Sequence, residues 1–150
     1  MKPLRILLLE TIGPMLQRSR QLMLPLRGFK NISRKVIIER GVRLDRVYPQ
    51  HIYIGDGTLV ASDVTILCHE HVYRDPTNPH MPLMKKTTIG KRCFIGVSAM
   101  ILPGVTIGDD CIIGAASVVA HDIPSGSVAV GVPARVIRSN IKLNDRAIMI

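Results

Sequence analysis

Residues 89–124 repeat with a period of six residues. Each block opens with an aliphatic residue, and in five of the six blocks the next residue is glycine or alanine. This period fits neither an α-helix, which turns every ~3.6 residues, nor an ordinary strand, which alternates every ~2 residues. It fits a short strand followed by a turn, and a fixed internal repeat of this kind indicates a solenoid. The six openers are Ile89, Ile95, Ile101, Ile107, Ile113 and Val119.

Three blocks make one triangular coil of about 18 residues, and successive coils stack at the roughly 4.8 Å spacing of paired strands. The openers then point inward as aliphatic ladders. We expect glycine at the corners because it tolerates the backbone angles of a sharp turn. Cys93 and Cys111 lie one coil apart, so they should stack as buried core residues. A chain of 150 residues suits one all-β domain, and an aromatic content of 3% suits its narrow core.

The repeat is clear from Ile54 to Ile66, stops, and resumes only at Ile89. We therefore expect an excursion loop over residues 69–87, which are rich in proline and histidine. Loops that leave a regular scaffold are where binding and catalytic residues concentrate. The solenoid with its excursion is expected to span residues 36–138 and to end in a strand and a tight turn.

Two flanking segments lack the repeat. Residues 1–35 are expected to form a short helical cap over the open end of the solenoid, or alternatively an amphipathic anchor on an anionic membrane surface. Residues 139–150 are expected to be a short helix or disordered. Residues 1–46 hold eleven Lys and Arg against three acidic residues, which is a net charge of +8 out of +9 for the chain. Such a basic end is typical of proteins that contact nucleic acid, an anionic membrane or an acidic substrate.

The composition of the chain indicates which partners and which cellular compartment to expect. Nucleic acid is not expected, because the chain has few aromatic residues for stacking and no recognised motif. Three cysteines without paired spacing argue against a disulfide framework and favour a reducing compartment. No stretch is long enough to span a membrane, and the apolar run at residues 6–9 is too short for a signal peptide. We expect a cytoplasmic protein whose basic end can contact the inner membrane surface.

Three of the five histidines, His69, His71 and His80, lie in the excursion. An imidazole titrates near neutral pH, and a neighbouring carboxylate such as Glu70 can orient it. The cluster is therefore a candidate general base. Cys68 adjoins the first histidine, so a covalent route through its thiol is an alternative.

Residues 64–71, 88–124 and 131–137 together resemble the hexapeptide-repeat left-handed parallel β-helix acyltransferase family, and within it the galactoside, maltose and polysaccharide O-acetyltransferases. The resemblance implies a left-handed β-helix, acetyl-CoA as acyl donor, no metal, and a homotrimer with sites between adjacent subunits. It also implies that a histidine deprotonates a sugar hydroxyl, which attacks the thioester directly. Counted without gaps, that histidine is His71; with the gap placed differently, it is His69.

The resemblance further implies a set of coenzyme contacts. Two arginines match basic residues that bind the coenzyme phosphates, and one alanine matches the path of the pantetheine arm. Three positions depart from the family pattern, in which Trp, Ser or Gly, and Lys are frequent; here they are Phe94, Val97 and His121. The expected coenzyme positions are Phe94, Val97, Ala115, Ala120, His121, Arg135 and Arg138.

Three other functions remain open at this point. An amino-sugar N-acetyltransferase would use the same fold and donor. A lyase resembling the zinc γ-carbonic anhydrases would need three histidines on one metal ion, and the spacing of His69, His71 and His80 does not match that family. A non-catalytic structural β-helix would need neither the paired histidines nor the two arginines.

Overall fold

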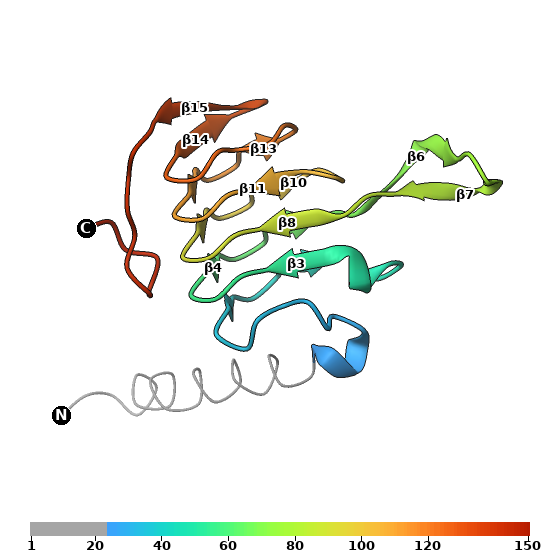
Figure 1. Ribbon diagram of the computed structural model, residues 1–150, viewed down its shortest axis with the longest axis horizontal. Coiled ribbons are helices and arrows are strands. Elements are labelled where there is room, and N and C mark those ends of the chain that lie inside the picture. Colours follow the sequence, from blue (N-terminus) through green and yellow to red (C-terminus); the bar gives the residue numbers. More distant parts are fainter. Residues whose placement is uncertain (1–23) are drawn as a thin grey trace.

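The computed structural model describes residues 24–150 and shows a left-handed parallel β-helix (Figure 1). The fold predicted from the repeat is confirmed. Most of the expected helical cap or membrane anchor falls on residues 1–23 and lies outside the described residues. Two short 3₁₀ helices, η1 (Pro25–Arg27) and η2 (Pro49–His51), lie near the start of the coil. Within residues 24–150 no α-helix occurs, and no helix is long and apolar enough to cross a membrane.

The strands form three faces of a prism and one separate hairpin. Face 1 contains β1 (Ile37–Ile38), β4 (Leu59–Val60), β9 (Phe94–Ile95), β12 (Ile112–Ile113), β14 (Val128–Gly131) and β15 (Ala134–Arg138). Face 2 contains β2 (Arg43–Leu44), β5 (Thr65–Ile66), β10 (Met100–Ile101) and β13 (Val118–Val119). Face 3 contains β3 (Ile52–Ile54), β8 (Thr87–Ile89) and β11 (Thr106–Ile107). The hairpin consists of β6 (His69–Asp75) and β7 (Asn78–Met84).

The openers of the repeat form the centre of the core. All six are at most 1% exposed. Each lies beside its equivalent one coil away, since Ile89 pairs with Ile107, Ile95 with Ile113, and Ile101 with Val119. Burying one such side chain contributes about 1.5–3 kcal/mol, so these stacked ladders are a major source of stability.

A column of small polar side chains runs inside the corner between faces 3 and 1. Thr58 Oγ1 donates to the carbonyl of Gly90 at 2.8 Å. Cys93 Sγ donates to the carbonyl of Gly108 at 3.1 Å, and Cys111 Sγ donates one coil further along, to Pro124, at 3.2 Å. The predicted stacking of the two buried cysteines is confirmed, and their thiols act as weak donors to the corner backbone.

The glycines that follow the openers are needed for close approach, and the turn-angle reason expected for them is wrong. Their φ angles lie outside the left-handed region, which falls two residues later on non-glycine residues such as Ser98 and Ala116. A Cβ added to Gly96 would lie 2.6 Å from the backbone nitrogen of Ala115 in the next coil. A larger residue therefore cannot fit between the coils without moving the backbone.

The excursion over residues 69–87 is ordered as an antiparallel hairpin, in which His69 pairs with Met84 and Asp75 with Asn78. Figure 1 shows β6 and β7 projecting sideways from the prism. The break in the repeat thus correctly located the excursion, but its proline-rich composition concealed the strands. The coil also begins slightly earlier than residue 36, because Ile32 already bridges to Ile54.

The C-terminal segment 139–150 is neither helical nor disordered, contrary to expectation. It runs in an extended form beside the prism and makes one antiparallel bridge, between Leu143 and Met149. Ile141 and Leu143 are buried, and the backbone N–H of Leu143 donates to Asp110 Oδ1 at 3.2 Å. Alternate apolar side chains and backbone hydrogen bonds to successive corners of the prism hold the segment in place. Its sequence therefore shows no helical periodicity.

Shortening one rung of the ladder should destabilise the fold far more than an outward change in the same strand. Ile107→Ala removes a fully buried side chain, and we expect a loss of about 2–5 kcal/mol in the free energy of unfolding measured by denaturant. Thr106→Ala is the matched control, since Thr106 is exposed, and it should change stability by less than about 0.5 kcal/mol. Equal losses in the two variants would contradict the ladder as the main source of stability.

Candidate active site

The hairpin leaves the coil at the corner between faces 2 and 3, and its base is tied to the coil backbone. The buried hydroxyl of Thr87 donates to the carbonyl of Leu67 at 2.6 Å and accepts from the N–H of Gly104 at 3.1 Å. The N–H of Lys85 donates to the carbonyl of Cys68 at 2.8 Å. The first residues of β6 therefore have a fixed position relative to the coil below them.

His69, the first residue of β6, pairs with a buried carboxylate from the previous coil. Its Nδ1 contacts Asp45 Oδ2, and the two side chains are 15% and 2% exposed. Asp45 follows β2 directly, and its carboxylate also accepts the N–H of Cys68 at 3.1 Å and the N–H of Val47 at 3.0 Å. Three donors thus hold one carboxylate, and the carboxylate in turn orients the imidazole.

The same contacts keep Asp45 ionised. Burial acts to raise the pKa of its carboxyl, but hydrogen bonds from Cys68, His69 and Val47 outweigh burial and lower the pKa below the ordinary value of 3.8. Because an ionised carboxylate only accepts hydrogen bonds, a neutral His69 carries its proton on Nδ1 and leaves Nε2 as a base. Burial, followed by the Asp45 charge, raises the pKa of the Cys68 thiol to about 12.

Other rings surround His69. The ring of Tyr48 meets it edge-on with centroids 5.7 Å apart, and the ring of His71 does so at 5.1 Å. His71 is exposed, whereas His69 is largely covered. His80 lies towards the tip of the hairpin, so the three histidines of the zinc-lyase alternative do not converge. In the part of the chain from 24 onward, no three metal-binding side chains gather in one place.

The expected coenzyme positions lie in three places on the prism. Val97 and Ala115 lie at the corner between faces 1 and 2 in successive coils, where the N–H of Ala116 donates to the carbonyl of Val97 at 2.8 Å. Phe94 belongs to β9, and Arg135 and Arg138 to β15, so these three lie on face 1. Ala120 and His121 follow β13 and lie at the other corner, between faces 2 and 3, above the hairpin. One chain therefore does not bring all seven together.

Sequence reasoning missed Asp45 and Tyr48. The register of face 2 aligns Asp45 with Leu67, Leu102 and Ala120 in the later coils. A carboxylate in a column that is otherwise apolar was the available signal. It was hidden because the repeat is irregular in the first coil, so the column could be aligned only once the structure was known.

Comparison with known proteins agrees with this geometry. Residues 86–121 match the family model described as bacterial transferase hexapeptide (six repeats). These residues therefore form a hexapeptide-repeat segment. It is 43% identical to the galactoside O-acetyltransferase of Escherichia coli (strain K12) over 96 residues, which cover 63% of this chain and 46% of that protein. The chain spans about half the length of the curated relatives it matches.

Two solved structures extend the likeness to most of the chain. A maltose O-acetyltransferase from Clostridium difficile 630 is 27% identical, with a TM-score of 0.58, and the match covers 83% of this chain and 87% of that one. A galactoside acetyltransferase in complex with coenzyme A is also 27% identical, with a TM-score of 0.55 and coverage of 89% and 84%. The resemblance to hexapeptide-repeat acyltransferases that residues 64–71, 88–124 and 131–137 indicated is confirmed.

Removing the charge of Asp45 should destabilise the protein in a pH-dependent way. A lowered pKa means that the ionised carboxylate stabilises the fold above pH ~3.8, and that this contribution is lost as the pH falls through the lower folded pKa. We expect Asp45→Asn to cost about 1–3 kcal/mol at pH 7 and less near pH 3, measured by urea unfolding. Asp63→Asn, at an exposed corner, is the control. A deficit that stays constant across this range would contradict an ionised Asp45.

Proposed function

We propose that this chain is an acetyl-CoA-dependent O-acetyltransferase that transfers an acetyl group to a hydroxyl of a sugar or polysaccharide unit. The observation that carries the proposal is the Asp45–His69 pair at the base of the hairpin that interrupts the repeat. The names of the galactoside and maltose enzymes support a carbohydrate hydroxyl as acceptor. The coenzyme A bound in one solved relative supports a coenzyme A thioester as donor.

The chemistry follows from the orientation of the imidazole. Nε2 of His69 takes the proton of the acceptor hydroxyl as its oxygen attacks the thioester carbonyl carbon. The carbon–sulfur bond then breaks, and the imidazolium returns the proton to the departing coenzyme A thiolate. Asp45 holds the ring and stabilises its positive charge, as the carboxylate does in other carboxylate–histidine pairs. A positioned general base of this kind contributes typically about 10²–10⁴-fold in rate.

The contacts favour His69 over His71 as the base, although the ungapped count favoured His71. His69 has the buried carboxylate partner, whereas His71 is exposed and its ring meets the His69 ring. We assign His71 to the acceptor side of the site. A covalent route through Cys68 is disfavoured, because a fully buried thiol with a pKa of about 12 holds almost no thiolate at neutral pH.

The division of the coenzyme positions supports a homotrimer with sites between subunits. Within one chain, Val97 and Ala115 lie at one end of the face 2 strands, and Ala120 and His121 lie at the other end. If two prisms pack side by side, the corner with Val97 and Ala115 on one subunit can meet the hairpin corner of its neighbour. Each site would then combine the His69 hairpin of one chain with a coenzyme wall from the next. We further propose a cytoplasmic location, with the basic N-terminal end contacting the inner membrane surface.

Truncating His69 should remove acetyl transfer while leaving coenzyme binding intact. We expect His69→Ala to lower kcat/KM by about 10²–10⁴-fold, because the general base is lost. His71→Ala should lower it by less than about tenfold and act mainly on the KM for the acceptor. The assay is thiol release from acetyl-CoA with a panel of mono- and oligosaccharides.

Asp45→Asn serves as the control for positioning. This variant keeps the His69 imidazole but removes the negative charge of Asp45. It should therefore change the pH profile of kcat/KM and reduce activity less than His69→Ala. Full activity of His69→Ala together with an inactive His71→Ala would transfer the role of base to His71. Activity on amino groups alone would replace the O-acetyl assignment by N-acetylation.

Arg135 and Arg138 should bind the phosphates of the coenzyme. We expect Arg135→Ala or Arg138→Ala to weaken acetyl-CoA binding by about tenfold in calorimetry, since each removes a charge-assisted pair of hydrogen bonds. Coenzyme lacking the 3′-phosphate should bind more weakly to the unmodified protein. Arg146→Ala, at an exposed position on the C-terminal segment, is the matched control. If the well-folded protein does not bind acetyl-CoA, the proposal that acetyl-CoA is the acyl donor is refuted.

A further inference from the structure

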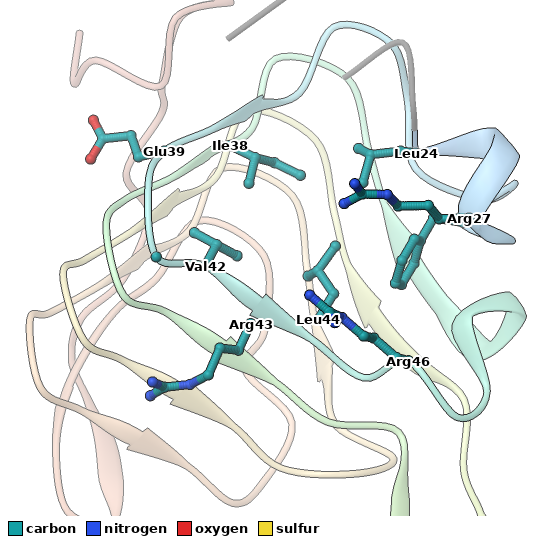
Figure 2. Close-up of a pocket in the computed structure, with 10 residues that line it drawn as sticks. Leu24, Arg27, Ile38, Glu39, Val42, Arg43, Leu44 and Arg46 are labelled. Carbon is teal, nitrogen blue, oxygen red and sulfur yellow. The ribbon is translucent and has the colours of Figure 1, made fainter. Parts of the chain in front are cut away.

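A hollow lies at the N-terminal end of the coil (Figure 2). Its volume is about 980 Å³. Its described lining comes from η1 with the residues on either side of it, and from residues 38–46 of the first coil. Half of that lining is apolar: Leu24, Phe29, Ile38, Val42 and Leu44. The remaining described lining residues are Arg27, Glu39, Gly41, Arg43 and Arg46.

Two arginines, Arg27 and Arg46, line this space, and no carboxylate among the described residues compensates their charge. Figure 2 shows the guanidinium groups of Arg27 and Arg46 turned inward, beside Leu24 and Leu44, whereas Arg43 and Glu39 turn outward. The two outward groups already have partners: Arg43 Nε donates to Thr65 Oγ1, and Glu39 accepts from Ser62. Among residues 24–150, no carboxylate pairs with Arg27 or Arg46.

Guanidinium groups next to an apolar floor select an amphiphilic anion. A planar guanidinium pairs with phosphate oxygens through two donors, and the apolar side chains can cover an aliphatic chain. We propose that this pocket binds an anionic membrane lipid, with its phosphate head between Arg27 and Arg46 and the upper part of its chain against Val42 and Leu44. The binding holds the N-terminal end of the coil at the membrane surface.

Charge complementarity favours this occupant over the alternatives. Residues 1–23 carry four basic residues and one acidic residue, so they would add to the positive charge. A second copy of the chain, with a net charge of +9, would do the same. A free phosphate would leave the apolar floor uncovered. Leu26 and Val47, each next to one of the two arginines, are 78% and 59% exposed, and such apolar residues can enter the lipid interface.

The position of the pocket also bears on the acceptor. Arg46 directly follows Asp45, and the hairpin with His69 leaves the next coil, only ~5 Å further along the axis. A sugar carried at the membrane surface would therefore be within reach of the candidate base. This point about the acceptor rests on the proposed acetyl transfer, whereas the lipid site itself does not.

The test is a calorimetric titration of the full chain with dihexanoyl-phosphatidylglycerol below its micelle concentration. We expect it to bind at least tenfold more tightly than dihexanoyl-phosphatidylcholine, which has the same chains and no net charge, and than glycerol 3-phosphate, which has no chains. Each arginine near an anionic lipid is worth about fivefold in affinity, so Arg27→Gln with Arg46→Gln should weaken binding about 25-fold.

The matched control is Lys30→Gln with Arg34→Gln, which removes two charges from the same end of the chain outside the described pocket lining. This pair should change the affinity by less than about threefold. Equal losses in both double variants would show diffuse attraction and overturn the site, as would equal affinity for the two lipids or tight binding of glycerol 3-phosphate. Acetyl-CoA binding, measured in parallel, keeps the two proposals apart, because lipid binding without any acetyl transfer refutes only the proposed activity.

Discussion

The stacking of successive coils about 5 Å apart is the constraint on which the rest of the structure depends. At that spacing an inward residue touches its equivalents above and below, so a column accepts only side chains that stack on themselves. Ile and Val meet this condition in the centre of the prism, where the openers are at most 1% exposed. At the corners two backbones approach so closely that a Cβ on Gly96 would meet a nitrogen at 2.6 Å. Glycine at those positions is a consequence of coil stacking, and the sharp turn itself is made by other residues.

The same register brings the candidate catalytic groups together. Asp45 and His69 are 24 residues apart in sequence but belong to neighbouring coils. Because the coil backbone is fixed by its ladders, the N–H of Cys68 lies where it can hold the carboxylate of Asp45. The hairpin then begins from a point tied down by Thr87. An imidazole at this point is oriented by rigid elements on both sides, which a free loop would not provide.

Periodicity explains what could be predicted from the sequence and what could not. The six-residue repeat determines the fold and the place of the excursion, because each block carries the same physical information. It says nothing about residues 139–150, which bind to the outside of the prism through Ile141 and Leu143. It also hides Asp45, because the first coil is irregular and its column can be aligned only through strand pairing. The histidines were visible from composition, but only the buried partner distinguishes His69 from His71.

Deviations from the repeat therefore mark where function is to be sought. The β-helix needs no net charge, and residues 47–150 carry only +1. Residues 24–46, in contrast, carry seven basic and two acidic residues at one end of the coil. Like charges so close together oppose folding through their mutual repulsion, and nothing in the stacking of coils requires them. An anion that lies against this end would relieve the repulsion. The positive charge of residues 24–46 is thus best explained by an anionic partner that binds to this end of the coil.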